Sequence, residues 1–412
     1  MYWRCRVTIR TTVPPRSKRI LDNVEGDLVV GRQTIVSGTG TPATVRVSGT
    51  VYCEGENLFE CSLTAERLEA EGDLVIRGDL TITNDIQVED GEMVVYGNLA
   101  AKDVDVDASL VVSKDLQVVN IDVGGSLKVD GKVKGENVDV GGSFVSRGPA
   151  EIDRVDVGGS VMIDSEANIE ELDVGGTAKI LSGKIRKIDV GGSFESERAL
   201  EFEEIDVGGT VCLGDKSKGK SIDVGGSFKV EGDLEFEEID VGGKVEITGS
   251  GKGKELDVGG KVEVGGSLEI SDSLEVGGKV EVRGEVSAGK IEVGGFLEAK
   301  KAKAEDSIEV GGAIITNEGA EARYIEIGKR GRIRGAVRGD RVVINEDARA
   351  EDIYGKKILL ERGAEANNVY GENVTIESHC RINGEIRYTS DLRIGDHVSL
   401  ANEPRKVDSL PE

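Results

Sequence analysis

The sequence predicts an all-β protein: a single-stranded parallel β-helix (β-solenoid) with three short strands per turn, about 17 residues per turn and right-handed coiling. A five-residue string, [ILV]-[DE]-V-G-G, recurs twelve times between residues 121 and 312. Its copies follow one another every seventeen residues, except for one spacing of sixteen and one of eighteen. Self-similarity at a short fixed period indicates a repeat architecture. Apolar and polar residues alternate within each repeat, which is typical of strands.

The repeat that begins at Ile205 illustrates the expected elements. Its alternation places Asp206 on the outside, and a later apolar pair, Leu234 and Phe236 in the next repeat, predicts a further strand. The Gly-Gly pair marks a corner where a positive φ or a close backbone approach excludes a Cβ atom. A turn of this length holds three short strands and leaves no room for a helix. The side chains expected inside are Ile205, Val207, Val211 and Leu213.

The same phase extends on both sides of the Gly-Gly repeats. We therefore expect a basic N-terminal arm or cap over residues 1–20, a continuous solenoid over residues 21–400 and a polar tail over residues 401–412. Within the solenoid, the regular repeats occupy residues 121–312 and less regular ones residues 321–400. Successive turns should stack about 4.8 Å apart. No single turn can bury its own interior, so stability comes from neighbouring turns.

Composition excludes several classes of protein. The chain has 412 residues, with 58 glycines, 6 prolines, 4% aromatic residues and a net charge of −26. Such a charge repels phosphates, so we expect no nucleic acid partner. The five cysteines are odd in number and match no zinc or redox spacing, which indicates reduced thiols in the cytoplasm. No stretch is long and apolar enough to span a membrane, and the first residues lack the apolar core of a secretion signal.

The second position of the repeat is always acidic, so stacking should place the carboxylates in one outward column. Like charges directly opposite each other destabilise a sheet. One hypothesis is a line of bound cations. We favour a simpler one, in which glycine amides or lysines partner the carboxylates and salt screens the rest. The column comprises Asp122, Asp139, Asp156, Asp173, Asp189, Asp206, Asp223, Asp240, Asp257, Glu275, Glu292, Glu309 and Glu326.

Two basic segments are candidate docking sites. The N-terminal arm alternates apolar residues, beginning with Trp3, against arginines, which fits a capping strand or peripheral contact with an anionic membrane. The second segment, residues 327–341, offers a patch for an anionic partner, or else pairs with nearby acids. We favour capping for the arm and pairing for the patch. The patch residues are Lys329, Arg330, Arg332, Arg334, Arg338 and Arg341.

Catalytic signals are weak. The two histidines, His379 and His397, lie outside the regular repeats and in no recognisable catalytic arrangement. The Gly-Gly pairs are not phosphate loops, because no helix follows them. We therefore expect neither an enzyme nor a cofactor or small-molecule substrate.

The C-terminal third resembles the bactofilin family of polymer-forming cytoskeletal proteins. The resemblance is carried by the run VVINEDARAEDIYGKKILLERGAEANNVYGENVTIESHCRINGEI, in which apolar-x-apolar strands alternate with small residues and glycine turns. It implies a right-handed triangular β-helix that joins end to end into nonpolar filaments without nucleotide, often near membranes. This chain is longer than a usual bactofilin core, and its VGG repeats are more regular. The alternatives are a hexapeptide-type acyltransferase, whose turns are slightly longer, and a surface adhesin or rigid spacer.

The C-terminal end is the expected site of self-association. The terminal turns of a solenoid carry unpaired backbone groups above an apolar core, which invites another chain to pair. The tail after residue 400 is short, polar and contains Pro404 and Pro411, so it is poor material for a cap. The residues expected to contact another copy are Ile386, Leu392, Ile394 and Val398.

Overall fold

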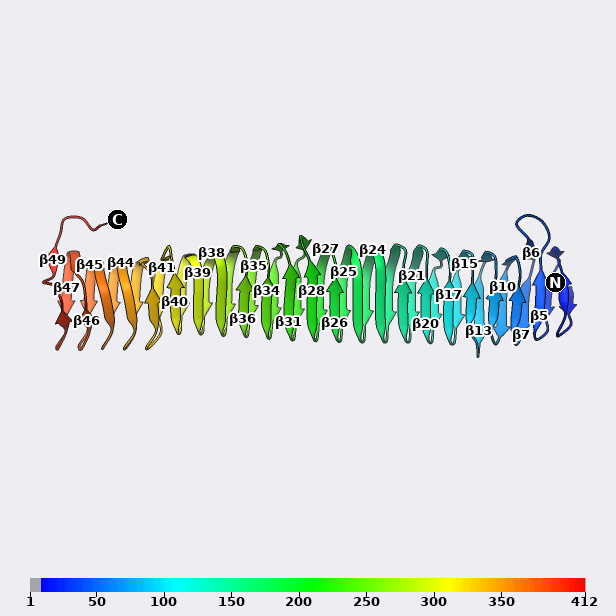
Figure 1. The fold of residues 1–412 in the computed structure, drawn as a ribbon, viewed down its shortest axis with the longest axis horizontal. Helices are drawn as coiled ribbons and strands as arrows, with labels where there is room; N and C mark the ends of the chain where they lie inside the picture. The colour runs from blue at the N-terminus through cyan, green and yellow to red at the C-terminus, as the bar shows by residue number, and fades with distance from the viewer. Residues whose placement is uncertain (1–8, 412) are drawn as a thin grey trace, which may run out of the picture. The chain divides into compact units, whose positions relative to one another are not determined.

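The computed structural model of the protein describes residues 9–411, and between them no helix occurs (Figure 1). The chain divides into two compact units, residues 1–203 and 204–412, which are described separately. Each unit is a parallel β-solenoid in which a strand pairs with its equivalent one turn later, as in Ile121 with Val138 and Ile205 with Ile222. Partners on successive turns are typically 17 residues apart. The predicted all-β solenoid and its period are confirmed.

Unit 1 begins with short strands. Pairing links β1 to β4, β4 to β7 and so on to β19, and the strands between them form ladders in the same way. The strands to Val123 are β1 (Arg10–Val13), β2 (Lys18–Ile20), β3 (Asn23–Val24), β4 (Asp27–Val30), β5 (Thr34–Ser37), β6 (Thr44–Val47), β7 (Thr50–Glu54), β8 (Asn57–Phe59), β9 (Ser62–Ala65), β10 (Arg67–Glu71), β11 (Leu74–Ile76), β12 (Leu80–Ile82), β13 (Asp85–Glu89), β14 (Met93–Val95), β15 (Leu99–Ala100), β16 (Asp103–Val106), β17 (Ser109–Val112), β18 (Leu116–Gln117) and β19 (Asn120–Val123).

Four of the later strands of unit 1, β21 and β23 to β25, are longer, because one strand continues around a corner into the next part of its turn. The later strands are β20 (Ser126–Val129), β21 (Val133–Val140), β22 (Ser143–Ser146), β23 (Ala150–Val157), β24 (Ser160–Val174), β25 (Thr177–Val190) and β26 (Ser193–Ser196). The following strand, β27 (Leu200–Val207), contains the boundary between the units.

Unit 2 mixes short and long strands. Its strands after β27 are β28 (Thr210–Gly214), β29 (Ser217–Lys218), β30 (Ser221–Val224), β31 (Ser227–Glu231), β32 (Leu234–Glu235), β33 (Glu238–Val241), β34 (Lys244–Ile247), β35 (Gly251–Val258), β36 (Lys261–Val264), β37 (Leu268–Val276), β38 (Lys279–Val293), β39 (Phe296–Val310), β40 (Ala313–Thr316), β41 (Ala320–Ile327), β42 (Arg332–Arg334), β43 (Val337–Ile344), β44 (Arg349–Leu360), β45 (Glu365–Ile376), β46 (Arg381–Ile382), β47 (Ile386–Ile394), β48 (Ser399–Leu400) and β49 (Arg405–Lys406).

Alternation along each strand separates core from surface as predicted. In the repeat at Ile205, that residue, Val207, Val211 and Leu213 are buried, whereas Asp206 is exposed. Asp206 pairs in register with Asp223, and Asp223 with Asp240, so the acidic residues are stacked on the outside. The core is mainly aliphatic, which is how a chain with few aromatic residues fills an interior.

The Gly-Gly corners are explained by close packing of successive turns. A Cβ atom on Gly158 would lie 2.5 Å from the carbonyl oxygen of Gly141, and one on Gly159 would lie 2.3 Å from that of Gly142. Neither glycine has a positive φ. Of the two reasons expected for glycine here, close approach is the one that applies.

The two irregular spacings are absorbed at corners. Between β24 and β25 the register changes after Ile163, which pairs with Ile180, and resumes with Glu166 opposite Ser182. Between β35 and β37 it changes between Gly253 and Glu255. Core positions such as Leu172 and Ile188 therefore stay aligned, because the extra or missing residue falls where the backbone turns.

Candidate functional site

Six aspartates of unit 1 are stacked in one outward column, which we call the aspartate column. Each pairs in register with the next, so neighbouring carboxylates are one strand spacing, about 4.8 Å, apart. All are exposed or half-buried, and none forms an ion pair or side-chain hydrogen bond with any residue in the range 9–411. The members are Asp105, Asp122, Asp139, Asp156, Asp173 and Asp189.

The glycine amide and lysine partners expected for this column are not found in the described part of unit 1. The nearby glycine amides donate to backbone carbonyls instead, as Gly141 does to Val123 and Gly142 to Gly125. No lysine pairs with these aspartates within the described part of the unit. Screening by salt and bound cations both stay hypotheses. The sequence could not exclude the amide partners, because backbone direction at the corner depends on how the turns stack.

Stacking has an electrostatic consequence for the aspartates. Partial burial, followed by the charges of the two neighbouring carboxylates, raises the pKa of Asp139 and of Asp173. The nearby guanidinium of Arg154 offsets part of the rise in both. The folded column therefore holds protons more readily than the unfolded chain does.

The column of acids in unit 2 is different towards its C-terminal end. The ammonium of Lys290 lies 2.6 Å from Glu292 and 3.9 Å from Glu275. Glu326 accepts hydrogen bonds from Tyr324 and Asn345. Beyond Glu326 the equivalent positions are apolar, Val343 and then Leu359, so the acidic series ends there.

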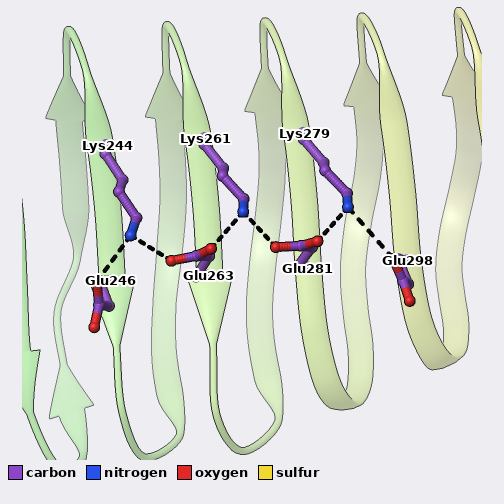
Figure 2. A network of polar contacts seen from close by, with 7 residues as sticks. All are labelled: Lys244, Glu246, Lys261, Glu263, Lys279, Glu281 and Glu298. Carbon is purple, nitrogen blue, oxygen red and sulfur yellow. Dashed lines mark hydrogen bonds and ion pairs between the residues drawn. The ribbon is translucent and has the colours of Figure 1, made fainter.

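Lysines and glutamates neutralise a second outward column, which we call the Lys–Glu zipper. Figure 2 shows each lysine bridging a glutamate of its own strand and a glutamate of the next turn. Hydrogen bonds from two lysines lower the pKa of Glu263 to about 2, and two glutamates raise the pKa of Lys261 to about 12. The members are Lys244, Glu246, Lys261, Glu263, Lys279, Glu281 and Glu298.

A third outward column of unit 2 alternates in sign along the stack. Lys218 lies 2.8 Å from Glu235, and Lys252 lies 3.0 Å from Glu269. Glu235 and Lys252 are themselves register partners. Two columns therefore balance their charges within the chain, whereas the aspartate column does not.

The six residues of the predicted basic patch differ in their partners. Lys329 forms an ion pair with Glu346 at 2.9 Å, and Arg338 lies over the ring of Tyr354, 3.9 Å from its centroid. Arg341 lies 5.7 Å from the ring centroid of Tyr324. The remaining three have no ion pair with a residue that the structure describes: Arg330, Arg332 and Arg334.

One surface residue near these arginines has no counterpart in the sequence prediction. Phe296 is 50% exposed, and its register partners are Lys279 before it and Ala313 after it. A departure in the repeat marks it, because the residue after Gly-Gly is lysine in the three preceding repeats and phenylalanine here. Phe296 could therefore have been singled out from the sequence, as an aromatic residue at an outward position of the repeat.

Core positions are uncovered at the C-terminal turn. Val374 and Ile376 are each 1% exposed, but their partners one turn later, Leu392 and Ile394, are half-buried and 42% exposed. Val398 is also half-buried, whereas Ile386 is fully buried. The predicted association residues thus divide into one buried and three accessible side chains. The last strand, β49, pairs with β47 through Arg387 and Tyr388, away from Leu392.

The predicted N-terminal arm is only partly described. Its alternating residues from Trp3 to Val7 lie outside the described residues. Ile9 is exposed, and β1 follows as the first strand of unit 1. Arg10 lies 5.5 Å from the ring centroid of Tyr52.

The two histidines lie close together at the surface, and two of the cysteines, Cys53 and Cys61, are buried. His379 and His397 are exposed corner residues with φ of 63° and 60°, and their ring centroids are 5.3 Å apart. Burial raises the pKa of Cys53 to about 12, and burial followed by the charge of Glu60 raises that of Cys61 to about 11, so neither thiol ionises readily. No group of three or more metal-binding side chains occurs among the residues described.

Comparisons with known proteins give no relative: no family model, no curated protein and no solved structure matches this chain. Between residues 9 and 411 there is also no helix of the length and apolarity needed to cross a membrane.

Proposed function

We propose that the protein is a structural, polymer-forming scaffold of the bactofilin type, which assembles through the ends of its solenoid without a nucleotide. In this proposal the coil is right-handed, with three short strands in every turn. The pairing of β7 with both β4 and β10 supports three strands per turn in unit 1.

The observation that carries the proposal is the apolar surface at the last turn. Ile394 is 42% exposed where its predecessor Ile376 is 1% exposed. Another copy that stacked on this turn would bury Ile394 and Leu392 as the next turn buries Ile376 and Val374. It would also pair the part of the β47 backbone edge around Leu392 and Ile394, which β49 leaves uncovered. Joining identical ends gives a two-fold dimer, and engaging both ends gives a filament.

We place this scaffold in the cytoplasm, with peripheral membrane contact through the basic N-terminal arm as a further proposal. Its partners are then other copies of itself, and it needs no cofactor or small-molecule substrate. The alternative from another class is an acyltransferase of the hexapeptide type. Acyl-CoA bound near His379 and His397 would favour that alternative, and a stable monomer would favour a rigid spacer.

Charge placed at the uncovered turn tests the proposal. Leu392→Glu together with Ile394→Glu should abolish end contacts, because two carboxylates would be buried in an apolar interface. The matched control is Arg393→Glu, since Arg393 lies between them on the outer side and is exposed. Electron microscopy and sedimentation velocity should show assemblies for the wild type and the control only. A wild-type protein that stays monomeric at tens of micromolar would contradict the proposal.

A further inference from the structure

The aspartate column presents a run of negative charge with no partner inside its own unit. The Lys–Glu zipper and the alternating column show that the same fold accommodates cations between acids at the same spacing. In unit 1, six consecutive turns lack any such cation at the aspartate position. The stacked carboxylates are accessible, and an approaching cationic surface would lower their mutual repulsion.

A surface of opposite charge lies on unit 2, and we call it the arginine–phenylalanine patch. Phe296 pairs with Ala313, and Ala313 with Arg332, while Ile315 pairs with Arg334. Both arginines are exposed on β42 and have no ion pair with a described residue. The members are Phe296, Ala313, Ile315, Arg332 and Arg334.

The other charged side chains beside the patch form ion pairs within the chain. The ammonium of Lys279 lies 3.4 Å from Glu298, which leaves that glutamate balanced. Arg349, the register partner of Arg332, lies 3.3 Å from Glu365. The charges of the patch without a local partner are therefore those of Arg332 and Arg334. Phe296, which is 50% exposed, adds apolar surface two turns before Arg332.

The two surfaces carry repeated charges of opposite sign. Arg332 and Arg334 are two residues apart along one strand, about 6.6 Å, whereas the aspartates of the column follow one another from turn to turn, about 4.8 Å apart. Because the column offers several carboxylates in a row, the two long arginine side chains can bind different ones. Arginine binds carboxylates through two parallel hydrogen bonds, which makes it well suited to such a contact.

We propose that copies of this chain also associate side by side, with the arginine–phenylalanine patch of one copy against the aspartate column of another. The inference rests on the proposed self-association and adds a side contact to the end contact. A second copy is the favoured occupant because its column supplies several carboxylates without an ion pair, and because the strongly acidic chain needs a local basic surface to approach itself.

Charge exchange between two variants tests the side contact. All proteins carry Ile394→Glu, so that end contacts do not contribute. One partner carries Arg332→Glu and Arg334→Glu, and the other carries Asp139→Lys, Asp156→Lys and Asp173→Lys. The protein with Ile394→Glu alone should associate, and high salt should weaken that association. Each charge variant alone should associate about tenfold more weakly, and an equimolar mixture of the two should regain association in sedimentation velocity.

Two further proteins separate association from folding. Asp139→Asn, Asp156→Asn and Asp173→Asn together should raise stability, by removing repulsion, while weakening the side contact; a purely structural column would show the first effect alone. Lys252→Glu with Lys254→Glu makes the same change in net charge as the arginine variant, outside the patch, and should associate normally. Failure of the mixture to regain association would overturn the proposal.

The same proteins separate lipid from protein as the occupant. If loss of Arg332 and Arg334 abolished binding to vesicles of phosphatidylserine and phosphatidylcholine but left self-association unchanged, an anionic membrane would be the partner and the proposal would be wrong. Failure of end assembly is detected independently, because filaments of the protein without Ile394→Glu do not require the patch.

Discussion

The aspartate column of unit 1 and the Lys–Glu zipper of unit 2 apply opposite solutions to the same problem. Both stack charged side chains on consecutive turns of a parallel solenoid. The zipper places a lysine two residues before each of its first three glutamates, so that every cation lies between two anions. In the aspartate column, Arg154 and Lys187 also stand two residues before an aspartate, but neither forms an ion pair with the column in the described chain. A repeat therefore does not force a protein to accept like-charge repulsion, because the placement of the cations decides whether a column is balanced.

The largest change in stability should come from the glycine corner next to the aspartate column. Gly158→Ala places a Cβ atom 2.5 Å from the carbonyl oxygen of Gly141, so adjacent turns must move apart. We expect a loss of about 2–3 kcal/mol in the free energy of unfolding, measured with denaturant. Gly135→Ala is the control, since the atom nearest to its Cβ would be a side-chain methyl of Val118 at 3.3 Å. Equal losses in both variants would contradict close packing as the reason for the Gly-Gly pair.

Removing one cation should convert part of the zipper into a column like that of the aspartates. Lys261→Ala leaves Glu263 and Glu281 stacked without the ammonium between them. We expect the melting temperature to fall by a few degrees and the pKa of Glu263 to rise. Because the pair is partly exposed, high salt should reduce the difference from the wild type. Lys254→Ala, which removes a single exposed ion pair to Glu237, should have a smaller effect.

Removing one anion should have the reverse effect in the aspartate column. Asp156→Asn takes away a charge between Asp139 and Asp173 and should raise the free energy of unfolding by about 0.2–1 kcal/mol. The pKa of both neighbours, followed by NMR, should fall towards the ordinary value. A destabilised Asp156→Asn variant would show that the carboxylate has a favourable partner and would refute the repulsive column.

Acidification should change the stability contributed by the two columns in opposite directions. We expect this effect to be the smallest of those predicted here. The raised pKa of Asp139 and Asp173 means that these groups take up protons in the folded state first, so stability should rise as the pH falls through their raised pKa towards the ordinary value of 3.8. The lowered pKa of Glu263 means that its stabilisation is present above 4.5 and is lost as the pH falls from 4.5 to about 2. Melting temperature should therefore pass through a maximum in mildly acidic solution.

Two variants test which residues cause the rise and the fall in melting temperature on either side of that maximum. Asp139→Asn with Asp173→Asn should remove the rise on the less acidic side of the maximum, and Glu263→Gln should reduce the fall below 4.5. A melting temperature that declined steadily from pH 7 in the wild type would contradict the first of these assignments.

The regular period of the repeat predicted the solenoid fold, and the alternation of apolar and polar residues predicted which side chains are buried. The spacing of the Gly-Gly strings aligned Ile205 with Ile222 and placed Asp206 outside, because the two-residue period of a strand leaves no other choice once one side is buried. The stacking of acids into a column followed from the same regularity, and so did the apolar surface expected around Leu392 and Ile394.

Only the tertiary structure decided which charges find partners. The six basic residues of segment 327–341 are close in sequence, yet Lys329 pairs with Glu346, Arg338 stacks on Tyr354, and Arg332 and Arg334 have no ion pair in the described chain. In a solenoid the neighbours of a side chain lie one turn away in sequence. Whether two such side chains come into contact depends on the geometry of the corner and on the local register, which short sequence patterns do not encode. For the same reason, the amide partners expected for the aspartates are bonded to backbone carbonyls instead.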